Sequence, residues 1–379
     1  MPVLPGINLL LDQHLALIAG RRIGLISNAS AVTSDLTYSL DALRHTPEVH
    51  LAALFGPEHG FYTAIADGAA VESTVDRQTD LPVHSLYGTA YKPTPDMLAG
   101  LDALVFDIQS VGVRFYTYIT TLLHTMQAAA ENGLPFIVCD RPNPIGGQAV
   151  EGPLLAAGFE SFVGPGPLPI RHGLTIGELA QLYNTVWGVG CDLTVAPCAG
   201  WQRSMWFDET GLPWVLPSPG MPTLATATVY PGMCLIEGTN LSEGRGTTLP
   251  FEVIGAPWVE GYALADALNS LGLAGVKFRP VQFAPTDSKW AGQLCHGVQT
   301  HVLNRDSLRP VTVGLHVVAT LRTLFPDHFD WRLPHFDRLM GTDQVRQQIE
   351  AGLPVSEIVA GWAGDLAAFE KQRREILIY

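Results

Sequence analysis

The chain has 379 residues, of which 47% are hydrophobic and 15% charged, and its formal net charge at pH 7 is −14. This length predicts two domains, and the apolar content is high enough for both to bury a core. The negative charge, together with the lack of clustered Lys and Arg, argues against nucleic acid or an anionic membrane surface as a partner.

The sequence contains no candidate membrane span, because its longest apolar stretches, such as residues 101–108, are much shorter than the roughly 18 residues required. Residues 1–10 lack the basic, apolar and cleavage regions of a secretory leader. We therefore expect a cytoplasmic protein, unless a leader precedes this sequence. The five cysteines are odd in number and widely spaced, which predicts reduced thiols in or near the core.

The first 200 residues alternate short apolar runs with helical patterns. Strands are predicted at 21–28, 49–55, 83–87, 103–108, 135–139 and 193–196. Helices are predicted after Ser34 as N-cap, at 118–132 and at 175–186. Continuous apolar strands that alternate with helices are typical of parallel βαβ units. We therefore expect residues 1–200 to form a Rossmann-like α/β domain with a mostly parallel sheet.

From about Trp201 the sequence becomes rich in Pro, Gly and Trp, and shorter predicted strands follow. We expect residues 201–379 to form a second, smaller α/β domain, with the active-site cleft between the two domains. Helices are predicted at 261–271, 311–324 and 355–375, and strands at 276–283 and 297–303.

Polar residues follow the predicted strands of the first domain. Open α/β sheets bind ligands outside the carboxyl ends of their strands, so these residues are candidates for a binding site. They are Asn28, Glu58, His59, Asp107, Gln109, Asp140 and Arg141. The sequence has neither a Gly-x-Gly-x-x-Gly after the first strand nor a Gly-x-x-x-x-Gly-Lys-[Ser/Thr], so we expect neither NAD nor ATP, and no other cofactor.

The segment GPEHGF at 56–61 is the leading catalytic candidate. Its two glycines and proline predict a tight turn that holds the carboxyl of Glu58 beside the imidazole of His59. Such a pair suits general acid and base catalysis. The alternative is a structural turn in which Glu58 caps a neighbouring helix.

The segment RFYTY at 114–118 suits a sugar, because aromatic faces stack on the ring while fixed donors and acceptors hold its hydroxyls. We expect Arg114 and Tyr116 to bind the substrate together with Asp107 and Gln109. The alternative is that the aromatic residues belong to the core and that Arg114 pairs with Asp107 for structural reasons.

Two later loops are dense in polar residues. In the first, DRPNPIGG at 140–147, two prolines restrict the backbone and can present Asp140, Arg141 and Asn143 at defined angles. The second, at 237–248, contributes the candidates Glu237, Asn240, Glu243 and Arg245. A solvated loop is the alternative for this second segment.

Two further observations do not add candidate site residues. A Thr-x-x-Glu capping box accounts for Thr175 and Glu178 without a functional role. No His-x-x-x-His pattern or paired carboxylate cluster indicates a metal site.

Five blocks in order resemble the exo-β-N-acetylmuramidase family of bacterial peptidoglycan turnover. They are GPEHGF at 56–61, LPVHSLYG at 81–88, FDIQSVGVRFYTY at 106–118, DRPNPIGG at 140–147 with VEGP at 150–153, and EGTNLSEGRGTTLPFE at 237–252. Nearly the whole chain is covered by the resemblance.

The resemblance implies a glycoside hydrolase that releases terminal N-acetylmuramic acid from the non-reducing end of peptidoglycan fragments, so the expected partner is a small carbohydrate. Glu58 would be the catalytic acid/base. The cleft would be lined by His59, Arg114, Asn143, Glu237, Asn240, Glu243 and Arg245. Two positions depart from the expected pattern: Ser110 stands in place of Asp, and Gly220 in place of Asn.

Glycosidases ordinarily use two carboxylates, but N-acetylated sugars can use their own acetamido oxygen instead. Substrate assistance is the leading hypothesis here, and a second carboxylate from Glu237 or Glu243 is the alternative. Arg114 or Arg245 would receive the lactyl carboxylate of muramic acid in bidentate fashion. A non-catalytic protein that binds sugars or muropeptides, and an esterase or deacetylase of cell-wall amino sugars, are the alternative functions.

Overall fold

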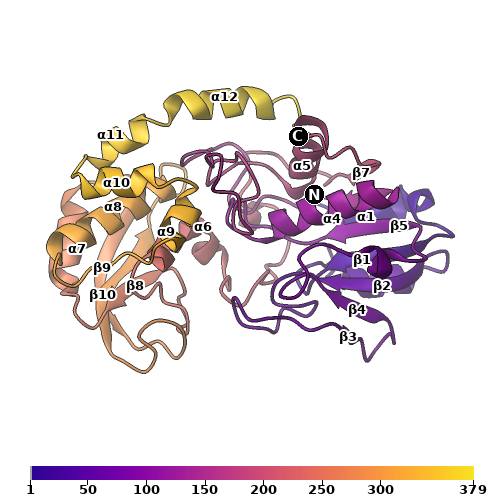
Figure 1. Cartoon of the computed structure of the whole chain (residues 1–379), viewed down its shortest axis with the longest axis horizontal. Helices are drawn as coiled ribbons and strands as arrows, with labels where there is room; N and C mark the ends of the chain where they lie inside the picture. Colours follow the sequence, from indigo (N-terminus) through magenta and orange to yellow (C-terminus); the bar gives the residue numbers. More distant parts are fainter. Residues whose placement is uncertain (1) are drawn as a thin grey trace.

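The computed structural model describes residues 2–379 and consists of two α/β halves that lie side by side (Figure 1). The first half is drawn in indigo to magenta and the second in orange to yellow. This arrangement confirms the expected fold class, a mostly parallel sheet domain followed by a smaller α/β domain.

The first half is built on a seven-stranded sheet in the order β3-β4-β2-β1-β5-β6-β7. All neighbouring strands are parallel except β3 and β4. The strands are β1 (Arg22–Ser27), β2 (His50–Gly56), β3 (Thr74–Val75), β4 (Pro82–Ser85), β5 (Ala103–Asp107), β6 (Phe136–Cys139) and β7 (Leu193–Ala196). The strand order reverses direction between β1 and β5, which is the position at which open α/β sheets form a crevice.

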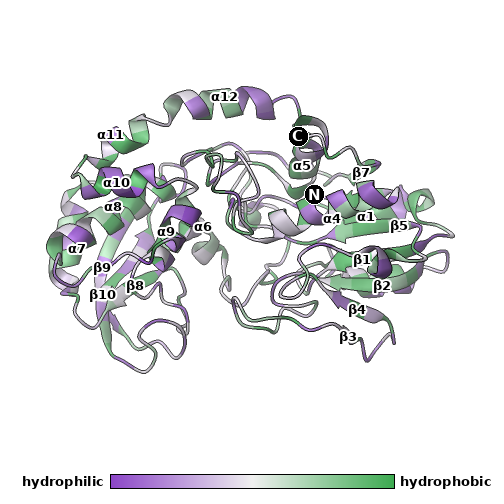
Figure 2. Ribbon diagram, in the orientation of Figure 1, coloured by the Kyte–Doolittle hydropathy of each residue, from purple (hydrophilic) through white to green (hydrophobic). Residues whose placement is uncertain are grey.

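Helices pack against both faces of this sheet, since the buried strand residues fall into two separate hydrophobic clusters that each include helical residues. They are α1 (Gly6–Asp12), η1 (Leu15–Leu17), α2 (Ser39–Arg44), α3 (Pro95–Leu98), α4 (Tyr118–Asn132), α5 (Ile176–Gln181) and the π-turn η2 (Leu182–Val186). The central strands β1, β2 and β5 are mostly hydrophobic (Figure 2). Burial from both faces explains the continuous apolar runs in the sequence.

Two helix starts can be compared with the sequence. Thr175 and Glu178 form the expected capping box at the start of α5. The expected N-cap at Ser34 was wrong, because its backbone N–H and its hydroxyl are bonded to the side chain of Asn8, and α2 begins only at Ser39.

The second half contains a three-stranded antiparallel sheet in the order β8-β10-β9. Its strands are β8 (Val253–Ala256), β9 (Val276–Phe283) and β10 (Cys295–Val302). Its helices are α6 (Leu224–Met233), η4 (Cys234–Gly238), α7 (Gly261–Ser270), α8 (Pro310–Leu324), α9 (His335–Met340), α10 (Gln344–Glu350), α11 (Val355–Ala360) and α12 (Ala363–Arg373). A further short helix, η3 (Phe207–Glu209), precedes them. The single helix expected at 355–375 was wrong, because the chain turns at Gly361 so that Trp362 is buried in the core.

The C-terminal segment returns to the first half, so that both chain ends lie there (Figure 1). The hydroxyl of Tyr379 donates to the Asp140 carboxylate at 2.7 Å, and Arg373 Nη2 donates to the backbone oxygen of Gln148 at 2.9 Å. Residues 201–217 also contact the first half, where Tyr118 donates to the backbone oxygen of Pro217 at 2.5 Å. The expected division at residues 200 and 201 stays a prediction.

Two expectations about the whole chain can be compared with the structure. All five cysteines are buried free thiols, as expected. Within residues 2–379, no helix has both the length and the apolar character to cross a membrane.

Arg114 is fully buried and joins the two halves. Its Nη1 donates to the backbone oxygens of Pro153 and Leu168 at 2.8 and 2.6 Å, and its Nη2 donates to that of Leu339 at 2.8 Å. No carboxylate of residues 2–379 pairs with it, and burial lowers its pKa to about 9. Arg114 is therefore a structural residue that satisfies three buried carbonyl groups.

Replacing Arg114 with Met should lower the free energy of unfolding by about 2–4 kcal/mol, because several buried carbonyl groups would lose their donors. Urea unfolding followed by circular dichroism measures this change. Arg77 is exposed, so Arg77→Met serves as the matched control. Equal stability of the two variants would contradict a structural role for Arg114.

Candidate active site

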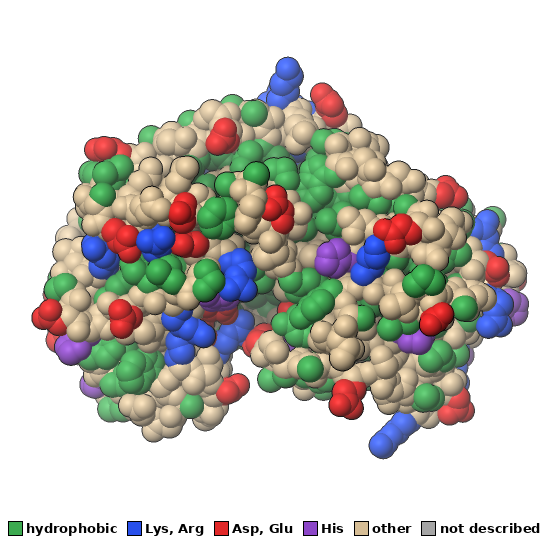
Figure 3. Space-filling model, viewed as in Figure 1, with side chains coloured by type: hydrophobic (Ala, Val, Ile, Leu, Met, Phe, Trp, Pro, Cys, Tyr) green, Lys and Arg blue, Asp and Glu red, His purple; other side chains and the backbone are tan. Residues whose placement is uncertain are grey.

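A cavity of about 500 Å³ lies between the two halves and is lined by residues from both. Its volume is within the range of pockets for small ligands. The first half contributes Glu58, His59 and Asp67, and the second half contributes Glu237 and Arg245. In the space-filling view the surface is hollowed between the halves, with Lys and Arg side chains along one side of the hollow (Figure 3).

Glu58 is carried into the cavity by the turn that follows β2. The turn is tight, because a side chain on Gly56 would lie 2.7 Å from the backbone nitrogen of Phe61. His59 adopts a left-handed conformation with φ 71°, which reverses the chain directly after Glu58. The sequence expectation of a tight turn at 56–61 is therefore confirmed.

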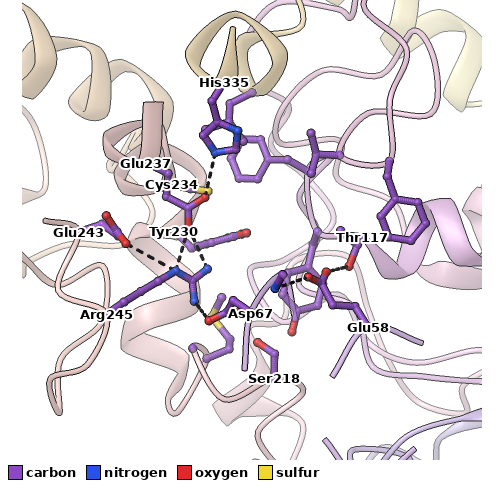
Figure 4. Close-up of a pocket in the computed structure, with 18 of the residues that line it drawn as sticks. Glu58, Asp67, Thr117, Ser218, Tyr230, Cys234, Glu237, Glu243, Arg245 and His335 are labelled. Atoms are coloured by element: carbon purple, nitrogen blue, oxygen red, sulfur yellow. Dashed lines mark hydrogen bonds and ion pairs between the residues drawn. The ribbon is translucent and has the colours of Figure 1, made fainter. Parts of the chain in front are cut away.

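The Glu58 carboxylate accepts hydrogen bonds from two segments. The Gly68 N–H donates to Oε1 at 3.1 Å, and the Thr117 hydroxyl donates to Oε2 at 2.7 Å (Figure 4). Thr117 is the N-cap residue of α4, so Glu58 lies near the positive end of a long helix. Burial, and then the neighbouring Glu58 carboxylate, raise the pKa of Tyr87 well above its usual value, so this phenol remains protonated.

His59 organises the loop that leads to Asp67. Its Nδ1 lies 2.8 Å from the backbone oxygen of Ile65, so Nδ1 carries a proton that it donates to this oxygen. Its Nε2 lies 3.5 Å from Asp67 Oδ1. The imidazole is 4% exposed and therefore positions Asp67 rather than facing solvent.

Arg245 lies at the centre of an ion-pair network that crosses the cavity (Figure 4). Its Nε and Nη2 donate to Glu237 Oε1 at 3.0 and 2.8 Å, and its Nη1 is paired with Asp67 of the first half. Glu243 Oε1 lies 3.7 Å from Nε. One guanidinium therefore faces three carboxylates and links the two halves.

The carboxylates of the second half have further basic neighbours. Lys289 Nζ lies 2.9 Å from Glu243, and His335 Nε2 lies 3.4 Å from Glu237. Burial alone would raise the pKa of Glu237, but Arg245 and then His335 lower it to about 2. Glu237 is therefore a carboxylate at neutral pH and cannot donate a proton.

Aromatic side chains form two surfaces of the cavity. Tyr230 packs edge-to-face against Phe115 and Phe251, with ring centroids 5.4 and 4.8 Å apart. On the first half, the rings of Tyr87 and Tyr91 lie 5.5 and 4.7 Å from the ring of Phe162. Both groups can pack against the faces of a sugar ring.

The structure brings six of the sequence candidates to the cavity: Glu58, His59, Tyr116, Glu237, Glu243 and Arg245. The other candidates do not line this cavity, and their role as substrate contacts stays a prediction. These are Asn28, Asp107, Gln109, Arg114, Asp140, Arg141, Asn143 and Asn240.

Polar side chains at strand ends can serve the protein itself, because the buried backbone groups there need hydrogen-bond partners. Asp107 pairs with Arg141, whose Nε and Nη2 donate at 2.5 and 2.9 Å, and both side chains are almost fully buried. Asp140 accepts from the Gly177 N–H at 2.7 Å and from the Thr175 hydroxyl at 2.8 Å. These acids and the arginine hold loops in place.

The amide side chains have similar structural roles. Asn28 donates to the Pro217 oxygen at 3.2 Å, Gln109 to the Pro142 oxygen at 2.9 Å and Asn143 to the Leu174 oxygen at 3.0 Å. Asn240 is bonded to the backbone of residues 328 and 330. Each amide joins segments that are distant in the sequence.

Several cavity residues were missed by sequence reasoning. Asp67 stands in an Ala-Asp-Gly turn that resembles any surface turn, and Arg332, His335 and Arg338 lie in a segment without a motif. Thr117 and Tyr87 belong to the resembling blocks but were not singled out. Gly220 lines the cavity, and a side chain there would lie 2.6 Å from Arg245 Nη1.

In residues 2–379, no group of three or more His, Cys, Asp or Glu side chains is arranged to hold a metal ion.

Comparison with known proteins identifies the family. Residues 23–225 match the family described as exo-beta-N-acetylmuramidase NamZ, N-terminal, and residues 228–379 match its C-terminal counterpart. The chain is 50% identical over 375 residues to peptidoglycan beta-N-acetylmuramidase NamZ of Bacillus subtilis (strain 168), covering 99% of this chain and 91% of that protein.

Solved structures are similar over the whole chain. Two DUF1343 family proteins from Bacteroides fragilis NCTC 9343 match with TM-scores of 0.93 and 0.80 and with 37% and 32% identity. In each case 100% of this chain and 99% of the other chain are covered. The matched residues span both halves and include the loops that line the cavity, and the chain belongs to the exo-β-N-acetylmuramidase NamZ family.

Proposed function

We propose that this chain hydrolyses the β-glycosidic bond of a terminal N-acetylmuramic acid at the non-reducing end of peptidoglycan fragments, with Glu58 as the acid/base. Family membership supports the reaction. One observation supports the residue. Among the cavity carboxylates within residues 2–379, Glu58 alone makes no ion pair with a Lys, Arg or His side chain.

The absence of an ion pair matters because a general acid must carry a proton in one step and release it in the next. Protonating Asp67 or Glu237 would break contacts with Arg245, whereas protonated Glu58 keeps a neutral donor, the Thr117 hydroxyl, within 2.7 Å. Glu58 is therefore the cavity acid that can gain or lose a proton without breaking an ion pair.

The leading mechanism uses the acetamido group of the sugar. Glu58 donates its proton to the glycosidic oxygen while the bond from that oxygen to C1 breaks, and the acetamido oxygen forms a bond to C1. The product of this step is a cyclic oxazolinium ion and a free leaving alcohol. Water then attacks C1 while Glu58 takes up a proton from it, which reopens the ring and restores the acid.

The contacts of the other carboxylates support this route over a second carboxylate that attacks C1. Glu243 is 1% exposed and paired with Lys289. Both carboxylate oxygens of Glu237 are in contact with basic side chains, one with Arg245 and the other with His335. Asp67 has a side chain that is 36% exposed. We infer that Asp67 accepts the acetamido N–H, which gains positive charge as the oxazolinium ring forms.

The two ends of the cavity indicate how the substrate is oriented. The terminal sugar is assigned to the space between Glu58 and the Arg245 network, because buried side chains of both halves line that part. The leaving sugar is assigned to the rings of Tyr87, Tyr91 and Phe162, since Tyr91 is 42% exposed and so reaches the surface. An enzyme that acts only on chain ends requires one closed end of this kind.

Replacing Glu58 with Gln should lower kcat by about 10²–10⁴-fold, because the amide keeps the shape but cannot donate or accept the proton. The loss should be larger on the natural disaccharide than on a nitrophenyl glycoside, whose leaving group needs less protonation. Release of N-acetylmuramic acid is measured for both substrates, with the melting temperature as a control for folding. Unchanged turnover in the folded variant would exclude Glu58 as the acid.

A thiazoline analogue of N-acetylmuramic acid should inhibit competitively and bind at least about 10²-fold more tightly than the substrate, because it resembles the oxazolinium intermediate. The first product should retain the β configuration when proton NMR is recorded before mutarotation. Inverted product without thiazoline inhibition would instead indicate a carboxylate that activates water. The first variants to make would then be Glu237→Gln and Glu243→Gln.

A further inference from the structure

Two positive charges of the cavity have no counterpart within the protein. Three of its five basic side chains, His59, Arg245 and His335, face carboxylates. The other two are Arg332 and Arg338, and neither forms an ion pair with any residue from 2 to 379. Arg332 Nη1 lies 3.5 Å from the backbone oxygen of Glu237, which is at most a weak contact.

Arg338 lies on α9, whose position is fixed by close packing, and Arg332 lies three residues before this helix begins. Phe336 of this helix is fully buried and packs so closely on η4 that a side chain on Gly238 would lie 2.5 Å from its Cα. Arg338 follows His335 by three residues and therefore lies on the same side of the helix. The two arginines thus flank His335, which contacts Glu237 at 3.4 Å on the wall of the second half.

The substrate has a group that needs such a partner. Muramic acid differs from glucosamine by a lactyl ether that ends in a carboxylate, and an enzyme that selects muramic acid has to recognise this charge. The two arginines expected from the sequence are unsuitable. Arg114 is fully buried among backbone carbonyls, and Arg245 already faces three carboxylates.

We propose that Arg338 and Arg332 bind the lactyl carboxylate and so select muramic acid over glucosamine. A guanidinium forms charge-assisted, bidentate hydrogen bonds with a carboxylate. Leu339 lines the cavity next to Arg338 and offers an apolar contact to the lactyl methyl group. This proposal rests on the proposed function, because it assigns a role to the arginines within the same substrate.

The test compares nitrophenyl N-acetylmuramide with the matching N-acetylglucosaminide. Arg338→Met or Arg332→Met should lower kcat/KM on the muramide by about 10–100-fold, the range expected for a lost charge-assisted contact. The kcat/KM on the glucosaminide should stay the same. Arg338→Lys should recover part of the loss, because it keeps the charge but not the planar group. Arg77→Met, which changes an exposed arginine outside the cavity, is the matched control.

A second measurement tests the role of the two arginines independently of catalysis. Binding of free N-acetylmuramic acid and of N-acetylglucosamine is measured by calorimetry for the wild type and for each variant. The affinity for N-acetylmuramic acid should fall in the variants, while that for N-acetylglucosamine should not. If the wild type releases no sugar, the proposed function fails, and the calorimetry still decides on the arginines. Equal losses for both sugars, or none for either, would overturn the arginine proposal.

Discussion

The ion pairs of Arg245 are the interaction on which the site depends. Its guanidinium binds Glu237 within the second half and Asp67 from the first, so it sets the distance between the two walls of the cavity. Glu243 is buried and Arg245 and Glu237 are only partly exposed, so losing one member would leave another charge without a partner. The pair with Arg245 lowers the pKa of Glu237, so Glu237 cannot donate a proton, and the proposed proton transfer is assigned to a different carboxylate.

That carboxylate, Glu58, is held by neutral donors. A hydroxyl and a backbone N–H fix its two oxygens, and the tight turn after β2 restricts its position. The site therefore separates two tasks. Fixed charges from both halves shape the part of the cavity around the sugar, while one acid that has no ion-pair partner is assigned the proton transfer. Environments that separate the roles of neighbouring acids are a general means of assigning acid and base.

The sequence was sufficient for the parallel sheet, because continuous apolar strands and capping boxes are local signals. It was also sufficient for the tight turn that places Glu58 at the cavity, since the glycines and the proline of this turn stand beside it. It did not show that Asp107, Asp140 and Arg141 lie outside the cavity, because a polar residue at a strand end can face a ligand or a buried backbone, and only tertiary packing decides which. Asp67 was missed because its partners, His59 and Arg245, are not adjacent to it in the sequence. Arg338 was missed because it forms no ion pair within residues 2–379 and stands in no motif.

The return of the C-terminal segment has a mechanical consequence. The chain passes from the first half to the second before α6 and comes back through α12, so two covalent crossings connect the halves (Figure 1). The second half is therefore held to the first at both of its ends, which limits the ways in which the two halves can move apart.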